Sequence, residues 1–238
     1  AEAVENVLKS YGVFVITGAG LKEIKEGTAV YTKNGEEDTL DGDAILLATG
    51  RGPNTEGLHA ERAGVELTKR GAVVTDKHLR TTAENIWAAG DVCGNLQFTY
   101  ISLDDSRIIL SDMQGDGSRT TENRGAFAYS VFMEPSFSRV GLSEKEAADK
   151  GLNYRVVRMN TDMIPKAKVL RKTTGMLKAV IDKDSGKIFG AALFCPESYE
   201  IINMVKLAMD HDLDYTVLRD FIYTHPTMSE GLNDLFAL

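Results

Sequence analysis

The last stretch of the chain contains the histidine that is best placed to do chemistry. His225 opens the sequence His-Pro-Thr-Met-Ser-Glu, which ends at Glu230 and precedes a short amphipathic segment. Imidazole is the side chain that most often gives or takes a proton in catalysis. Glu230 also has a purely structural interpretation, because Thr227 and Glu230 have the spacing of a helix capping box. The sequence leaves open whether this carboxylate serves the helix, the histidine or both.

A glycine and an aspartate follow a predicted buried strand in the first half of the chain. Residues 86–89 (Ile-Trp-Ala-Ala) have the pattern of such a strand, and Gly90 and Asp91 come directly after it. Ligands bind at the carboxyl ends of strands in open α/β sheets, and glycine allows a ligand to approach the backbone closely. Taken alone, Gly-Asp after a strand is more simply an ordinary turn.

Neither cysteine belongs to a pattern that carries redox or metal chemistry. Cys93 and Cys195 lie far apart in sequence, so neither forms a Cys-x-x-Cys pair or a zinc framework. We expect both to be small, partly buried apolar side chains. No cluster of His, Cys and Asp has metal-ligand spacing, so no metal site is predicted. The remaining histidines lie in polar segments and are predicted to be exposed: His59, His78 and His211.

The segment Gly18-Ala19-Gly20 is similar to the start of a dinucleotide-binding loop. Glu23 stands where the third glycine of that loop belongs. A carboxylate at a helix N-terminus would also repel the pyrophosphate that such a loop holds. We therefore predict a simple turn here.

Composition limits the class of protein. A length of 238 residues suffices for one large or two small domains, and 43% hydrophobic with 26% charged residues is typical of a globular protein. The formal net charge of -8 argues against a nucleic-acid binder. The longest apolar runs, such as residues 44–48, are too short to cross a bilayer, and no export leader opens the chain. The sequence therefore predicts a cytoplasmic protein that binds neither nucleic acid nor membrane.

The hydrophobic pattern predicts an α/β part followed by an α+β part. The first part has buried strands and a hairpin turned at Asn34-Gly35, and it ends at a break over residues 115–118. In the second part, a capping box over residues 143–146 opens one helix. The other predicted helices are 3–10, 103–113 and 198–210, and the predicted strands are 13–16, 28–32, 37–40, 43–48, 86–89, 128–132, 154–159, 176–182 and 187–194.

Two motifs in this order resemble the pyridine nucleotide-disulfide oxidoreductases, a family that includes glutathione reductase, dihydrolipoamide dehydrogenase and mercuric reductase. The first is residues 48–54 (Ala-Thr-Gly-Arg-Gly-Pro-Asn), and the second is residues 81–91, ending in Ala-Ala-Gly-Asp. The resemblance implies FAD and NAD(P)H as cofactors. In the family the first motif, with Gly50 and Arg51, links the nicotinamide domain to the flavin domain. The aspartate of the second motif, here Asp91 after Gly90, binds the ribityl chain of FAD.

The same resemblance implies roles for two further parts of the chain. Phe98 and Thr99 lie where the family has a turn into a helix whose N-terminus faces the flavin ring, although Tyr100 replaces the usual proline. The family's counterpart of His225 is the acid/base residue, and that of Glu230 fixes the histidine tautomer. A cis peptide bond before Pro226 is also implied.

Within the family, one bacterial branch is the most similar. The segments 98–105, 129–135 and 225–236 resemble the reactive-chlorine-resistance flavoproteins. That branch is described as reducing hypothiocyanite or cupric ion with NAD(P)H. A small-molecule oxidant such as hypothiocyanite is therefore the expected substrate.

The resemblance divides the chain into three parts. Residues 1–43 are expected to be the C-terminal half of the NAD(P)-binding domain and residues 44–118 the second segment of the FAD-binding domain. Residues 119–238 are expected to be an α+β dimerisation domain, which implies a homodimer.

The mechanism of the family needs motifs that this chain lacks. These are two glycine-rich dinucleotide loops and a Cys-x-x-x-x-Cys pair. We therefore expect the chain to be the C-terminal part of a longer enzyme and to be inactive alone. In that enzyme, hydride passes from NAD(P)H through FAD and the cysteine pair to the oxidant, and His225 acts across the dimer. The alternative is a stand-alone dimerisation module without catalysis.

Overall fold

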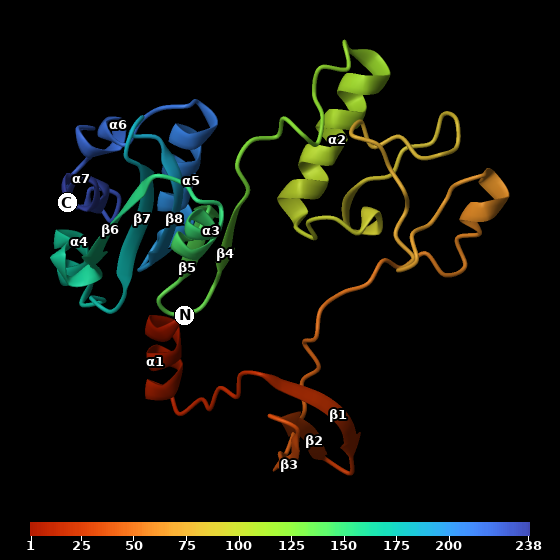
Figure 1. Ribbon diagram of the computed structural model, residues 1–238, viewed down its shortest axis with the longest axis horizontal. Coiled ribbons are helices and arrows are strands. Elements are labelled where there is room, and N and C mark those ends of the chain that lie inside the picture. Colours follow the sequence, from red (N-terminus) through yellow and green to blue (C-terminus); the bar gives the residue numbers. More distant parts are fainter. The chain divides into compact units, whose positions relative to one another are not determined.

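The computed structural model describes residues 1–238, which form two compact units (Figure 1). One unit consists of Ile16–Arg124. The other consists of Ala1–Val15 together with Gly125–Leu238, and we call it the C-terminal unit. No helix in the chain combines the length and the hydropathy needed to span a membrane.

The unit of residues 16–124 begins with a small antiparallel sheet in the order β1-β2-β3. Its strands are β1 (Ala19–Lys25), β2 (Thr28–Lys33) and β3 (Glu36–Asp41). Asn34 and Gly35 have φ angles of 53° and 86°, as the predicted type I′ hairpin requires. Gly18, with φ of 71°, lies in a turn just before β1, so the prediction of a simple turn there is confirmed.

A helix and two short 3-10 turns complete this unit. They are η1 (Ala60–Ala63), η2 (Gly90–Cys93) and α2 (Thr99–Gln114). Two small apolar clusters pack here, one of Ala60, Val65 and Val73 and one of Leu79, Cys93 and Ile108. The second cluster joins α2 to the segment that precedes Asp91.

The predicted buried strands 13–16, 43–48 and 86–89 are wrong for this structure. None is a strand, and only an isolated bridge joins Trp87 to Arg80. Phe14 is 92% exposed and Leu46 is 88% exposed. The physical reason is that a strand needs a neighbour to take up its backbone hydrogen bonds. No strand pairs with residues 13–16 or 43–48, and residues 86–89 have only the isolated bridge to Arg80.

The C-terminal unit is built on one antiparallel sheet in the order β4-β5-β8-β7-β6. Its strands are β4 (Ala128–Val131), β5 (Phe137–Gly141), β6 (Tyr154–Asn160), β7 (Met176–Asp182) and β8 (Ile188–Phe194). The sequence predicted all of them except β5. That strand presents Ser138 as well as Val140 to the interior, so its apolar alternation is hidden.

Helices cover this sheet. Helix α5 (Ser198–Asp210) packs on β4, β5 and β8, and α7 (Gly231–Ala237) packs on β6 and β7. Helix α3 begins with the predicted capping box, since the Ser143 and Glu146 side chains each accept the other's N–H. The remaining helices are α1 (Glu2–Ser10), η3 (Thr161–Met163), α3 (Glu144–Asp149), α4 (Pro165–Leu170) and α6 (Thr216–Arg219). The mixed α/β architecture is the predicted fold class.

A chain of serine hydroxyls crosses the core of the C-terminal unit. Oγ–Oγ distances are 2.7 Å between Ser130 and Ser138, 2.8 Å between Ser138 and Ser198, and 2.9 Å between Ser198 and Ser136. Ser136 donates to the carbonyl of Cys195 at 3.0 Å. Each hydroxyl can therefore donate once in a single direction, from β4 through β5 and the start of α5 to that carbonyl. Each of these four serine hydroxyls therefore has a hydrogen-bond partner.

Replacing Ser198 by alanine should lower the free energy of unfolding by about 1–3 kcal/mol, because two buried hydroxyls lose their partner. Urea unfolding of the wild-type and variant chains measures this difference. Ser130→Ala is the matched control, since Ser130 is partly exposed and ends the hydroxyl chain. Equal losses in both variants would show that the chain of hydroxyls contributes no more than its individual members.

Candidate functional site

The structure brings His225 and Glu230 into contact at the start of α7. The Nδ1 atom of His225 lies 2.7 Å from Oε2 of Glu230. The other carboxylate oxygen, Oε1, accepts the N–H of Thr227 at 2.9 Å, and the Glu230 N–H donates to Oγ1 of Thr227 at 3.3 Å. Glu230 therefore serves both the helix and the histidine, one oxygen for each. The His225–Pro226 peptide bond is cis, as expected.

This contact determines which nitrogen of the neutral imidazole remains available to a partner molecule. With Nδ1 donating its hydrogen bond to Glu230, the neutral ring has its unprotonated nitrogen at Nε2, which can accept a hydrogen bond. The His225 side chain is 68% exposed, whereas that of Glu230 is 16% exposed. Partial burial by itself would raise the pKa of the Glu230 carboxyl, but the hydrogen bonds from His225 and Thr227 outweigh it and lower that pKa. The geometry suits a proton acceptor facing outward.

Acidification should loosen the tail as Glu230 takes up a proton. Its pKa in the folded chain lies below the ordinary value of 4.5. Its contribution to stability is therefore fully present above that value and is lost as the pH falls through the folded-state pKa. Amide hydrogen exchange of residues 225–237, followed from neutral pH downward, measures the loss of protection. Glu230→Gln should lack this pH dependence, and an unchanged profile in that variant would assign the effect to other groups.

Burial of the segment that follows the histidine anchors this pair. Met228 and Leu232 are buried, and Leu235 and Phe236 of α7 complete the same core cluster. Asn233, which the sequence did not single out, donates its side-chain amide to the carbonyls of three residues: Leu218, Arg219 and Phe221. An asparagine within an amphipathic helix is the signal that could have found it.

A second group of predicted residues surrounds a hollow of about 410 Å³ in the unit of residues 16–124. Arg51, Gly90, Asp91 and Thr99 line it, so four of the six predicted cofactor residues come together. Ala89, Gln97 and Ser102 complete the lining. Gly50 and Phe98 are not in the lining, although each is next in sequence to a residue that is.

Asp91 and the start of α2 supply the polar groups of this hollow. The Asp91 carboxylate is exposed and has no hydrogen-bond partner in the chain, so it can accept hydrogen bonds from hydroxyl groups. Thr99 is the first residue of α2, and the helix dipole favours negative charge at this end of the helix. The ring of Phe98 lies 5.3 Å from that of Tyr100. A polyhydroxyl chain and an electron-rich ring edge fit this set of donors and acceptors.

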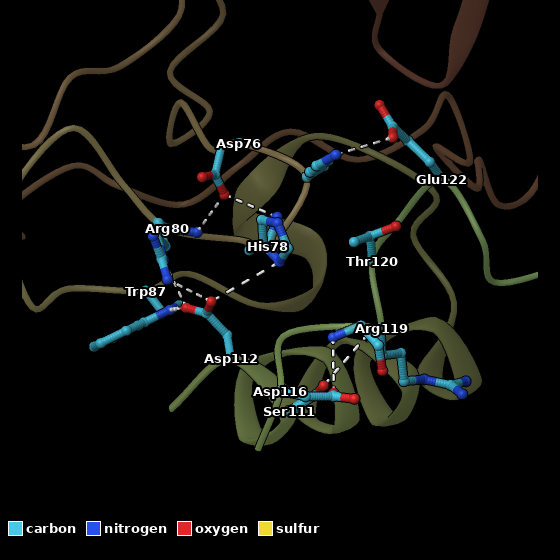
Figure 2. A network of polar contacts seen from close by, with 12 residues as sticks. Asp76, His78, Arg80, Trp87, Ser111, Asp112, Asp116, Arg119, Thr120 and Glu122 are labelled. Carbon is cyan, nitrogen blue, oxygen red and sulfur yellow. Dashed lines mark hydrogen bonds and ion pairs between the residues drawn. The ribbon is translucent and has the colours of Figure 1, made fainter. Parts of the chain in front are cut away.

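Two carboxylates that share one face of α2 were missed by the sequence analysis. Asp105 accepts the N–H of Gly90 at 2.8 Å and a guanidinium N–H of Arg124 at 2.7 Å. Asp112 accepts the indole N–H of Trp87 at 2.8 Å and two N–H groups of Arg80 at 2.6 Å (Figure 2). The signal was available, because both aspartates share the helix face of the apolar Ile101 and Ile108.

The prediction that His78 is exposed is wrong. Its side chain is 22% exposed, and its buried Nδ1 points toward Asp112 at 3.8 Å without a hydrogen bond (Figure 2). The reason is tertiary, since the loop that carries His78 and Arg80 folds against the end of α2. The other two histidines predicted to be exposed, His59 and His211, are exposed.

Comparison with known proteins decides the family. Residues 1–106 match the family described as pyridine nucleotide-disulphide oxidoreductase, and residues 127–236 match the dimerisation domain of the same enzymes. The chain belongs to the pyridine nucleotide-disulfide oxidoreductases. Membership confirms the family predicted from the sequence and implies FAD and NAD(P)H as cofactors.

Individual relatives of this oxidoreductase chain agree with that family. It is 47% identical over 238 residues to the probable pyridine nucleotide-disulfide oxidoreductase RclA of Escherichia coli, covering 100% of this chain and 54% of the relative. It is 34% identical over 237 residues to mercuric reductase of Staphylococcus aureus, covering 98% of this chain and 43% of the relative. The chain therefore spans about half the length of the curated relatives that it matches.

A solved structure shows the same likeness. The HOCl-induced flavoprotein disulfide reductase RclA from Escherichia coli superposes with a TM-score of 0.91 at 46% identity. The match covers 100% of this chain and 55% of the solved one. The similarity thus extends over both units of the oxidoreductase chain.

The cysteines of this oxidoreductase chain are not activated thiols. Burial raises the pKa of Cys93 to about 11 and that of Cys195 to about 12. Both are buried, at 7% and 0% exposure, and neither is in a disulfide. Because the thiolate is the reactive form, neither side chain is a nucleophile near neutral pH. No group of three or more His, Cys, Asp or Glu side chains is placed to hold a metal ion.

Proposed function

We propose that this chain supplies the acid/base histidine and part of the flavin site of a FAD-dependent NAD(P)H:disulfide-type oxidoreductase. The observation that carries the proposal is the contact of Nδ1 of His225 with Glu230 on a side chain that is 68% exposed, because this contact leaves Nε2 of the neutral ring to act as the acceptor. The hollow beside Arg51 and Asp91 supports the flavin part. The proposal also assigns each part of the chain to a domain. Residues 1–43 belong to the NAD(P)-binding domain, residues 44–118 to the FAD-binding domain and residues 119–238 to the dimerisation domain.

In the flavin site, each residue has a role that its position allows. Asp91 accepts hydrogen bonds from the ribityl hydroxyls, and Gly90 lets the ligand approach the backbone. The N-terminal end of α2, which begins at Thr99 directly after Phe98, would favour negative charge on a bound flavin. Arg51 lines the same hollow, and Gly50 directly precedes it in the sequence. The chemistry that FAD supplies when bound is acceptance of hydride from NAD(P)H and reduction of a close cysteine pair, a motif that this chain does not contain.

His225 then handles the proton of the thiol chemistry. Its Nε2 takes the proton from the attacking thiol, and the imidazolium is stabilised by the Glu230 carboxylate. The same proton is returned to the leaving group of an oxidant such as hypothiocyanite. In a homodimer with two-fold symmetry, the histidine of one subunit serves the thiol of the other. The unpaired, buried cysteines fit a cytoplasmic protein.

The experiment uses the complete protein that carries this chain. It is expected to be yellow, to be dimeric by light scattering, and to oxidise NAD(P)H in the presence of hypothiocyanite. This chain alone is expected to retain little FAD after gel filtration and to have no activity. A complete protein that is dimeric but binds no flavin and oxidises no NAD(P)H would overturn the proposal in favour of a non-catalytic dimerisation module.

A further inference from the structure

One face of helix α2 carries two carboxylates in a setting that is otherwise apolar. Ile101, Asp105, Ile108 and Asp112 follow one another at spacings of three or four residues, so they lie on the same side of the helix. Ile101 is 6% exposed, Asp105 is 3% exposed and Ile108 is 0% exposed. Buried carboxylates are costly unless each is paired, so their presence on this face needs a structural reason.

Both carboxylates hold the segment that leads to Asp91. Asp112 binds Arg80 at the start of that segment and Trp87 closer to its end (Figure 2). Asp105 binds the backbone N–H of Gly90, the residue directly before Asp91. Helix α2 therefore binds the segment through two aspartates that lie seven residues apart in the helix.

The contact at Gly90 controls the direction of the next residue. Gly90 has a φ of 75°, and a Cβ atom there would lie 2.7 Å from Oγ of Ser102 on α2. The backbone thus passes close against the helix in a conformation that glycine favours. A hydrogen bond to the Gly90 N–H fixes the plane of the peptide between Ala89 and Gly90. The orientation of that peptide plane helps to set the direction of the Asp91 side chain, which lines the hollow.

Arg124 completes the arrangement. One of its N–H groups donates to the second oxygen of Asp105 at 2.7 Å, and its side chain is 15% exposed. The two donors to Asp105, a peptide N–H and a guanidinium, can only donate, so an ionised carboxylate satisfies both at once. An amide in its place would turn an NH₂ group toward one of the two donors.

We propose that Asp105, held by Arg124, is a positioning residue for Asp91 in the flavin site. This inference rests on the proposed function, because it takes Asp91 to be the ligand of the ribityl chain. Asp105 does not touch the cofactor. It sets the Gly90 peptide so that the Asp91 carboxylate meets the ribityl hydroxyls in the bound state.

The neighbouring Asp104 provides a matched control. It is 8% exposed, contacts the guanidinium of Arg119 and lies 3.4 Å from Nε of Arg124, but it makes no contact with Gly90. Asp104→Asn and Asp105→Asn therefore remove the same charge from the same buried cluster, and only the second disturbs the Gly90 peptide. A general loss of stability would affect both variants alike.

The test measures FAD binding by the complete protein. The apoprotein is titrated with FAD while flavin fluorescence is recorded, and the visible circular dichroism of the bound flavin reports its setting. Asp105→Asn should weaken FAD binding by about tenfold or more, the loss of roughly one charged hydrogen-bond interaction, and should change the dichroism band. Asp104→Asn should bind FAD within about twofold of wild type with an unchanged band. Equal binding by wild type and Asp105→Asn, or equal weakening in both variants, would overturn the inference.

A second variant covers the case in which Asp105→Asn fails to fold. Arg124→Lys keeps the positive charge but loses the planar guanidinium, so Asp105 becomes less firmly held. It should give a smaller loss of FAD affinity and the same direction of change in the dichroism band. An Arg124→Lys protein with unchanged affinity and band would count against the inference. Failure of the wild-type protein to bind FAD would instead refute the proposed function, so the two failures are distinguishable.

Discussion

Replacement of His225 by alanine in the complete protein is expected to slow reduction of the oxidant by about 10²–10⁴-fold, the usual contribution of a positioned general acid or base. In the proposed mechanism, Nε2 of this exposed ring accepts the thiol proton, and alanine offers no acceptor. Reduction of the flavin by NAD(P)H should stay within about twofold of wild type, because that half-reaction uses no proton from His225. Stopped-flow absorbance of the flavin measures both half-reactions separately.

His211→Ala is the matched control for this experiment. His211 is also an exposed histidine of the C-terminal unit, but it has no carboxylate partner, and its replacement should change neither half-reaction. Glu230→Gln should give a smaller loss than His225→Ala, since the imidazole remains but loses the carboxylate that fixes its tautomer. If His225→Ala slows both half-reactions equally, the histidine is structural and the proposed role is wrong.

Replacement of Phe236 by alanine is expected to lower the free energy of unfolding of the chain by about 3–5 kcal/mol, as for other fully buried phenylalanines. Phe236 is 1% exposed, and its ring lies 6.1 Å from that of Tyr215. It belongs to α7, the helix that begins directly after Glu230. Removing the ring leaves a cavity in the core and loosens the element that holds the histidine pair. Chemical unfolding followed by far-ultraviolet circular dichroism measures the change.

Phe221→Ala is the control, because Phe221 is 52% exposed and its loss creates no buried cavity. It should change the free energy of unfolding by less than about 1 kcal/mol. Hydrogen exchange of residues 225–230 in the Phe236→Ala chain gives a second readout and should show faster exchange. Unchanged exchange rates of residues 225–230 would show that the packing of α7 does not hold the His225–Glu230 pair in place.

Local sequence was sufficient to predict an element wherever neighbouring residues alone determine its structure. The type I′ hairpin at Asn34-Gly35 and the capping box at Ser143 are examples, because both depend on residues within one turn of each other. Helix α5 and strand β7 have the predicted bounds, since a regular apolar pattern determines which face is buried. Strand β5 was missed because a buried hydroxyl, Ser138, stands where the pattern requires an apolar residue.

The apolar runs at 13–16 and 43–48 show where pattern alone fails. Both have the composition of central strands, yet a strand exists only when neighbouring strands accept and donate its hydrogen bonds. The chain contains no partner for either run, and the side chains of Phe14 and Leu46 remain exposed. Composition predicts which segments can be buried, whereas pairing depends on what lies beside them.

For the candidate site, the sequence identified candidate residues, and the tertiary structure decided which of them contact one another. The motif from His225 to Glu230 and the pair Gly90-Asp91 could be found from residue type and spacing. Only the folded chain shows that Glu230 gives one oxygen to Thr227 and the other to His225. Only the packing of α2 reveals that Asp105 holds the Gly90 peptide. The reason is that a sequence motif shows only which chemical groups are present. Hydrogen bonds between residues far apart in sequence form during folding, because a buried polar group without a partner is unfavourable.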